Sequence, residues 1–305
     1  MTSILQVLID AFALGSLYAL SALAIGLVFG IMRLINFAQG DLITIGGYAL
    51  IVPSSQMVAE LFIGDWPWVA MVPAIVAVCV AAALLTERIA FRPIRDADPA
   101  TLLITSFAVS FFIQNVILLV YTGRPKAAGI FPGLSQSVTL AEGLTVPGIQ
   151  LVTSAVAILL LAGLAFFLKR TRTGTEMRAV AEDFTMARLL GVRSNRVIML
   201  AFALAGALAG TVAVLLVAQT GVLDFRMGVF LAVYAFFATV LGGMNSLVGA
   251  AVGGYVVGGL SVVLQAFLPD DLRPYRDAFL FGIVILLLLW RPQGLVVGKA
   301  GRERV

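Results

Sequence analysis

The sequence predicts an all-α polytopic integral membrane protein. Of its 305 residues, 61% are hydrophobic and 12% are charged, whereas a soluble globular chain carries about 25% charged residues. Apolar runs recur along the whole chain, and many are as long as the roughly 20 residues that a helix needs to cross the hydrocarbon core. Because too few charged residues remain to cover a water-facing surface, we expect a single transmembrane domain over residues 1–305.

Six apolar runs are long enough to form transmembrane helices, and they lie at about 5–30, 67–90, 100–121, 149–168, 197–219 and 247–268. Three shorter or interrupted runs lie at about 38–60, 227–242 and 276–290. Together these runs predict eight to nine transmembrane helices, some of them broken.

Lysine and arginine are concentrated in the loop at 87–98, in the segment at 169–196 and in the tail that carries Arg291 and Lys299. Cytoplasmic loops carry an excess of these residues, so we expect these three regions, including the C-terminus, to be cytoplasmic. The N-terminus and the loops at 122–148 and 269–277 are then expected outside.

The segment at 169–196 interrupts the apolar sequence with seven basic and three acidic residues. Thr173 and Glu176 have the spacing of a capping box, which satisfies the free N–H groups at a helix start. Apolar residues follow at helical spacing, and Gly191 can end the helix in a left-handed conformation. We therefore expect an amphipathic helix at about 174–190 and a new helix from Ser194 or Asn195. The residues alone favour equally a segment on which a soluble partner acts and a helix lying at the membrane surface.

Two polar, glycine-rich stretches enter apolar runs, at 36–48 and at 242–255. QGDLITIGGY at 39–48 can be laid over SLVGAAVGGY at 246–255, which suggests two related halves at about 1–125 and 149–292. Interrupted membrane segments in matching positions of two halves indicate a transport path, although such glycines also serve simply to let helices pack closely. The candidate path residues are Asn36, Gln39, Asp41, Thr44, Asn245 and Ser246.

Several classes of chemistry lack their usual residues. The chain has no histidine and a single cysteine, Cys79, so we expect no metal site, no intrachain disulfide and no catalytic residues. No G-x-x-x-x-G-K-[ST] loop is present, so we expect no cofactor bound by this chain and no ATP hydrolysis by it. The basic surplus is explained by membrane topology and does not indicate a nucleic-acid partner.

Four blocks of sequence carry a resemblance to a known family. They are RLINFAQGDLITIGGYA at 33–49, EMRAVAEDFTMARLLGV at 176–192, ATVLGGMNSLVGAAVGG at 238–254 and RPQGLVVGK at 291–299. In this order and over nearly the whole chain, they resemble the branched-chain amino-acid ABC transporter permease family. The N-F-A-x-G-D start of the first block is similar to the LivH-type subunit.

The resemblance implies an ABC type II importer-like permease in a bacterial inner membrane, which transports branched-chain or related amino acids. Its implied partners are a homologous LivM-type permease, two cytoplasmic ATPase subunits that carry ATP and Mg, a periplasmic substrate-binding protein and membrane lipid. The block at 176–192 would correspond to the ATPase-coupling helix within the cytoplasmic segment 169–196. Its implied coupling residues are Met177, Val180, Glu182, Asp183, Phe184, Arg188 and Gly191.

In this reading the apolar stripe of Met177, Val180 and Phe184 would enter an ATPase groove, and the charged residues would set its register. The exterior loops would contact the binding protein through Arg124, Lys126, Asp270, Asp271 and Arg273. An ion-coupled secondary transporter of a small polar solute, with Asp41 as the coupling group, is the alternative. A scaffold protein or membrane enzyme is a second alternative, and the missing catalytic groups argue against the enzyme.

Overall fold

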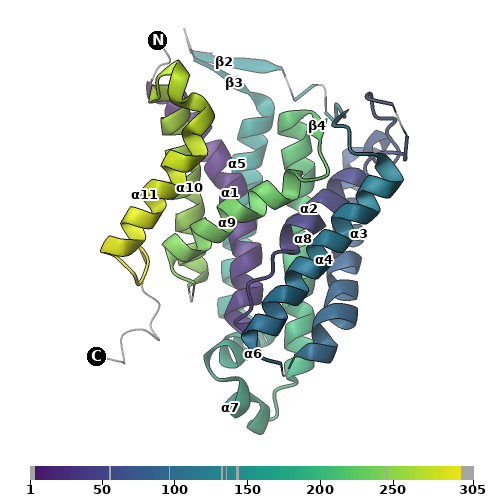
Figure 1. The fold of residues 1–305 in the computed structure, drawn as a ribbon, viewed down its shortest axis with the longest axis vertical. Helices are drawn as coiled ribbons and strands as arrows, with labels where there is room; N and C mark the ends of the chain where they lie inside the picture. The colour runs from purple at the N-terminus through teal and green to yellow at the C-terminus, as the bar shows by residue number, and fades with distance from the viewer. Residues whose placement is uncertain are drawn as a thin grey trace. The chain divides into compact units, whose positions relative to one another are not determined.

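A computed structural model describes residues 4–296 apart from positions 55, 96, 132, 135, 142, 143 and 245. Helices make up most of it (Figure 1). Within the described residues, six helices are long and apolar enough to cross a membrane. They are α1 (Ile4–Met32), α3 (Trp68–Thr86, continued by short turns to Ile94), α4 (Pro99–Tyr121), α5 (Gly148–Arg170), α8 (Ser194–Thr220) and α10 (Leu247–Phe267). Each coincides with one of the six long runs, so those six predicted helices are confirmed.

The shorter runs form shorter helices. They are α2 (Gln39–Tyr48), α9 (Met227–Gly242) and α11 (Arg276–Trp290). The run at 38–60 is helical only as far as Tyr48. Beyond it the chain doubles back, with the Val52 amide donating to the Glu60 carbonyl at 2.9 Å and the Phe62 amide donating to the Leu50 carbonyl at 2.9 Å. The total of eight to nine transmembrane helices therefore stays a prediction.

The remaining elements are small. Two helices, α6 (Arg172–Glu182) and α7 (Phe184–Leu189), lie in the charged segment. Strand β1 (Lys126–Ala127) pairs with β4 (Val222–Leu223), and β2 (Ser137–Ala141) pairs with β3 (Leu144–Pro147), both antiparallel. A π-helical turn, η2 (Glu87–Phe91), extends α3, and single 3-10 turns lie at η1 (Ile63–Asp65), η3 (Arg92–Ile94) and η4 (Asp270–Tyr275).

The chain forms two compact units, each assembled from separate stretches. Unit 1 comprises Met1–Gly26, Phe131–Leu164 and Val233–Val305, and unit 2 comprises Leu27–Ile130 and Ala165–Ala232. The two sequence-related halves were expected to be consecutive, at about 1–125 and 149–292. The compact units interleave along the chain. They do not test a relation between the two halves in sequence, so the internal repeat stays a prediction.

Unit 2 is built on the antiparallel packing of α3 against α8. A Cβ placed on Gly206 would lie 2.8 Å from the Ala83 Cβ, and one placed on Gly210 would lie 2.8 Å from the Val76 Cα. The two helices therefore meet backbone to backbone at these glycines, which is how membrane helices gain packing without a hydrophobic driving force. Helix α2 packs on both of them, because a Cβ on Gly46 would meet Cys79 of α3 and Ala213 of α8.

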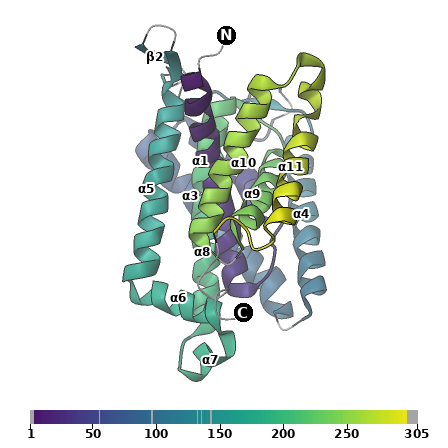
Figure 2. The same cartoon turned by 90° about the vertical axis from the view of Figure 1, so that its left-hand side faces the viewer.

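In unit 1 the N-terminal part of α1 packs on α10 (Figure 2). The Ser16 Oγ lies 3.2 Å from the Tyr255 hydroxyl, and the Phe12 and Tyr255 rings stack with centroids 5.1 Å apart. The Thr239 hydroxyl of α9 donates to the Ala22 carbonyl of α1 at 3.1 Å. Polar side chains thus join helices whose other contacts are apolar, as is common in membrane bundles.

Candidate functional site

The charged segment leaves α5 and returns to α8 through two short helices, α6 and α7 (Figure 1). Thr171 caps α6, because its hydroxyl accepts the Gly174 amide at 3.0 Å. The predicted capping box at Thr173 and Glu176 is therefore wrong by two residues. Thr171 lies at the end of α5, where its extended backbone (φ −96°, ψ 153°) ends one helix and starts the next.

Asp183 divides what was predicted as one helix at 174–190. Its backbone is extended (φ −145°, ψ 105°), and its carboxylate accepts the Met186 amide at 2.9 Å. An aspartate is among the residues that cap helix starts most strongly. The prediction of a single helix is wrong because this residue serves as the cap of α7.

The end of the segment agrees with the prediction. Gly191 adopts φ +86°, and its amide donates to the Arg188 carbonyl at 3.0 Å. The Val192 amide donates to the Ala187 carbonyl, also at 3.0 Å. These paired bonds around a left-handed glycine form a Schellman cap, and α8 then begins at Ser194 as expected.

The apolar stripe predicted to enter an ATPase groove lies mostly inside the protein. Met177 and Val180 are each 2% exposed, and Phe184 is half-buried. Helix α6 packs on α8, so Met177 and Val180 hold α6 to its own unit. In this structure these two residues anchor the segment, and their predicted contact with an ATPase groove stays a prediction.

A different apolar surface is exposed on α7 and just after it. Met186, Leu189 and Leu190 are 54%, 77% and 79% exposed. We call these three residues the α7 surface. The sequence periodicity did not reveal this surface, because it was read for one continuous helix from residue 174. The break at Asp183 turns the residues of α7 to faces other than those of a continuous helix. The pair Leu189-Leu190 between Arg188 and Gly191 was the signal that could have revealed it.

The charged candidates are close to this surface in the sequence. Glu182, Asp183, Arg188 and Gly191 are all exposed. The Arg188 guanidinium lies over the Phe184 ring, 5.8 Å from its centroid. The segment thus has an apolar patch with charges of both signs beside it, which is the usual composition of a protein-binding surface with a charged rim.

The path candidates of the first broken stretch are buried in unit 2. Asn36, Gln39, Asp41 and Thr44 are at most 2% exposed. The Asn36 side-chain oxygen accepts the Ala38 amide at 3.1 Å, and the Gln39 side-chain amide donates to the Ala205 carbonyl of α8 at 3.0 Å. Asp41 lies beside Ser110 and Gln114 of α4.

Polar atoms in this stretch remain without hydrogen bonds to other described residues. They include the Asn36 Nδ2 and the Gln39 Oε1, both buried. A buried polar group without a partner costs free energy, so such groups indicate a place where water or a polar solute is accommodated. Asn36 and Gln39 therefore remain candidates for the path, and their role there stays a prediction.

The second broken stretch belongs to unit 1. The Ser246 hydroxyl accepts the Gly249 amide at 3.0 Å and so caps α10. Asn245 lies outside the described residues. The first stretch, at 36–48, belongs to unit 2, so each is described within its own unit.

Lys126 does not fit its predicted role as an exterior docking residue, because its side chain is fully buried. Its ammonium group donates to the Ser54 carbonyl and to the Gln56 carbonyl at 2.9 Å. Lys126 thus ties the loop after α2 to strand β1. Arg124, Asp270, Asp271 and Arg273 are exposed, with Arg273 and Asp270 paired at 2.6 Å.

Replacing Lys126 by methionine is expected to loosen the loop at 51–62. The change keeps an unbranched side chain but leaves two carbonyls without their charged donor, at a cost of about 1–3 kcal/mol. Limited proteolysis of the purified protein in detergent should cut this loop faster than in the wild type. The exposed Arg124→Met is the matched control, and equal protection of Lys126→Met and wild type would contradict the assigned role.

In the part of the chain that the structure describes, six helices are long and apolar enough to cross a membrane, which defines the class as a polytopic membrane protein. Comparison with protein families then identifies the chain more closely. It belongs to the family described as "Branched-chain amino acid transport system / permease component", whose model matches residues 7–289. The predicted family resemblance is confirmed.

Individual relatives agree with this assignment. The chain is 35% identical to the high-affinity branched-chain amino acid transport system permease protein BraD of Pseudomonas aeruginosa, over 99% of this chain and 98% of BraD. It is 34% identical to LivH of Escherichia coli K12, over 99% of this chain and 97% of LivH. Among solved structures, an inward-facing metal-chelate type ABC transporter matches with 16% identity and a TM-score of 0.47, over 92% of this chain and 85% of that chain.

Proposed function

We propose that the chain is the membrane-spanning permease subunit of an ABC importer for branched-chain or related amino acids. The observation that carries the proposal is membership in the permease family over residues 7–289. The exposed α7 surface supports it, because we propose that the segment carrying this surface is the coupling segment. The proposed partners are a homologous LivM-type permease, two cytoplasmic ATPase subunits and a periplasmic binding protein. The proposed location is a bacterial inner membrane with a cytoplasmic C-terminus.

The α7 surface supplies the ATPase contact in this proposal. Its three apolar side chains are held in place because α6 is anchored on α8 through Met177 and Val180. A partner that pulls or pushes α7 therefore acts on α8 through a packed helix. Arg188 and Glu182, which are exposed near the apolar patch, are suited to fix its register.

The membrane orientation follows from the ends of unit 2. The basic loop at 87–95 and the start of α8 meet at one end, through Arg95 and Asn195. At the other end, β1 and β4 join the chain after α4 to the chain after α8. Because basic loops are retained in the cytoplasm, we assign the first end to the cytoplasm and the second to the exterior.

The proposed path runs along the buried polar groups at 36–44. ATP-driven approach of the ATPase subunits would move α7 and, through α8, the helix α2 that Gln39 joins to the Ala205 carbonyl. Access to the path would then change from outside to inside. Substrate choice would rest largely with the separate binding protein.

The test is substrate-stimulated ATP hydrolysis in proteoliposomes that contain this chain with its ATPase, permease and binding-protein partners. We expect hydrolysis and leucine uptake to require both the binding protein and ATP. Uptake that proceeds without ATPase subunits and follows a proton or sodium gradient would instead favour the secondary transporter. Asp41, buried beside Ser110 and Gln114, would then be its coupling group.

A further inference from the structure

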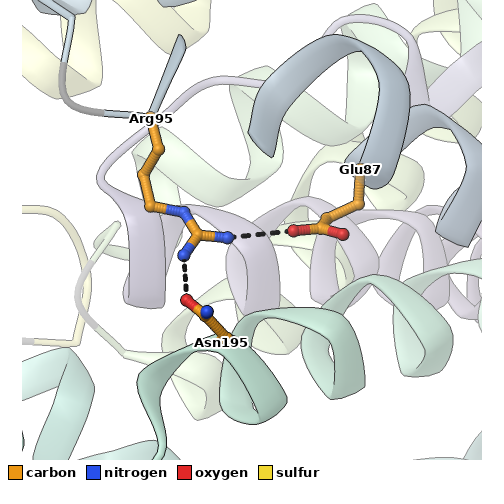
Figure 3. A network of polar contacts seen from close by, with 3 residues as sticks. All are labelled: Glu87, Arg95 and Asn195. Carbon is orange, nitrogen blue, oxygen red and sulfur yellow. Dashed lines mark hydrogen bonds and ion pairs between the residues drawn. The ribbon is translucent and has the colours of Figure 1, made fainter. Parts of the chain in front are cut away.

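At the end of unit 2 that we assign to the cytoplasm, one arginine joins two helices (Figure 3). The Arg95 Nη2 donates to the Glu87 carboxylate at 3.0 Å, and the Arg95 Nη1 donates to the Asn195 side-chain oxygen. Glu87 is the first residue of the π-helical turn η2 that extends α3, and Asn195 is the second residue of α8. We call these three residues the Arg95 junction.

The junction is built into the fold and is not a chance surface contact. The Glu87 side chain is 2% exposed and that of Arg95 is 16% exposed. A buried carboxylate is costly unless it is paired and hydrogen-bonded, and Arg95 supplies the partner. A guanidinium is planar and offers its N–H groups in a fixed fork, so the position of Glu87 and the position of Asn195 are coupled through a single rigid group.

The place of the junction along the chain matters. Asn195 follows directly on the segment that carries α6 and α7, and only Val192, Arg193 and Ser194 separate it from the Gly191 cap. Along the chain, a displacement of α7 therefore reaches Asn195 before it reaches the rest of α8. Glu87, on the other side, lies in a π-helical turn of five residues, an irregularity that is frequent at functional sites.

The helices beyond the junction lead to the broken stretch. Helices α3 and α8 meet closely at Gly206 and Gly210, and α2 packs on both at Gly46. The Cys79 thiol of α3 also donates to the Leu42 carbonyl of α2 at 3.3 Å. The close packing at Gly206 and Gly210 holds the middle of α3 and α8 together. The junction adds the polar link that fixes their register at the end next to the coupling segment, and breaking it leaves that end of α8 without its tie to α3.

We infer that the Arg95 junction is the joint that makes α3 follow α8 when the coupling segment moves, so that ATP hydrolysis is converted into movement at residues 36–48. The inference rests on the proposed importer function and deepens it by naming positioning residues outside the coupling helix. Arg95 and Asn195 contact neither the ATPase nor the transported solute in this scheme. Their effect is on the ratio of transport to hydrolysis.

The test measures ATP hydrolysis and leucine uptake in the same proteoliposomes of the complete transporter. The variants are Arg95→Gln and Asn195→Ala, with Arg92→Gln as the control. Arg92 is exposed, and its replacement removes the same charge from the same loop. We expect both test variants to raise the ATP consumed per leucine by at least about fivefold, a typical size for coupling between sites, and Arg92→Gln to leave this ratio unchanged.

Three further comparisons separate positioning from simple loss of stability. Asn195 is exposed, so Asn195→Ala should leave assembly intact even where Arg95→Gln lowers the yield. Asn195→Asp keeps an acceptor for Arg95 and should restore the ratio of the wild type. The double variant Arg95→Gln with Asn195→Ala should be no worse than the poorer single variant, because both changes remove one shared contact.

The outcomes distinguish failure of the proposed importer function from failure of the role proposed for the Arg95 junction. If the wild-type complex shows neither substrate-stimulated ATP hydrolysis nor ATP-dependent uptake, the proposed function itself is overturned. A coupled wild type whose Asn195→Ala variant keeps the normal ratio would overturn the junction inference alone. The junction inference is also overturned if Asn195→Ala uncouples transport and Asn195→Asp does not restore the ratio. The effect would then not depend on the side-chain oxygen that accepts the Arg95 hydrogen bond.

Discussion

Replacing Gly228 by alanine is expected to destabilise unit 2 severely, whereas Gly163→Ala should be tolerated. Gly228 is the second residue of α9 and Gly40 is the second residue of α2, and the two backbones touch at these residues. A Cβ on Gly228 would overlap the Gly40 carbonyl and lie 2.6 Å from the Thr44 hydroxyl oxygen. The added methyl group therefore meets backbone, which cannot turn aside as a flexible side chain can.

The contact is held from a second direction. The Gly228 amide donates to the Thr44 hydroxyl at 3.2 Å, and a Cβ on Gly40 would in turn lie 2.8 Å from the Ala232 Cβ. Overpacking at such a place costs about 1–3 kcal/mol and sometimes more. The broken stretch at 36–48 carries the path candidates, so its displacement should reduce uptake as well as stability.

Thermal unfolding of the purified chain in detergent measures the first effect. A Cβ on Gly163, inside α5, would meet nothing within 4 Å, and alanine favours a helix by about 1 kcal/mol over glycine. Gly163→Ala should thus unfold at the wild-type temperature or slightly above, and Gly228→Ala well below it. Equal unfolding temperatures for the two variants would mean that α2 and α9 do not touch as described.

Local and compositional features were readable from the sequence. The six long helices follow from hydropathy alone. An apolar run of about 20 residues enters the lipid, where its backbone polar groups must be satisfied within the segment, and a helix does this. The Gly191 cap and the start of α8 at Ser194 follow from the preference of glycine for left-handed backbone. Both depend on neighbours within a few residues.

Features that depend on distant residues were not readable. Nothing near Lys126 indicates that it is buried, because its carbonyl partners lie about seventy residues earlier in the chain. The approach of Gly40 to Gly228 and the junction of Arg95 with Asn195 are likewise contacts between separate helices. Asp183 is an intermediate case: an aspartate fits equally a charged helix face and a helix cap, and the chain uses it as a cap.

Leu189→Asp is expected to abolish coupling to the ATPase subunits while leaving the membrane-spanning part folded. Leu189 is 77% exposed and belongs to the α7 surface, so a charge there meets water in the isolated chain. In the assembled transporter it would be buried against the partner. Losing the burial of one leucine costs about 1.5–3 kcal/mol, which weakens association roughly 10- to 150-fold.

Co-purification of the ATPase subunits with the permease, followed by stimulated ATP hydrolysis, measures this effect. Thr185→Asp is the matched control, because Thr185 is an exposed, polar residue of α7 and the change adds the same charge to the same helix. We expect Thr185→Asp to retain most of the association. Similar losses in both variants would indicate that charge on α7, and not its apolar surface, decides binding.

The variant Met177→Ala tests which of two surfaces binds the ATPase: the α7 surface or the stripe of Met177, Val180 and Phe184 predicted from sequence periodicity. Met177 is 2% exposed, and truncating a buried methionine to alanine costs about 2–5 kcal/mol of stability. We expect Met177→Ala to unfold at a lower temperature, while the fraction that remains folded still binds ATPase with normal stoichiometry. The opposite pattern, normal stability with lost ATPase binding, would restore Met177 to the interface and would mean that α6 turns outward in the assembled transporter.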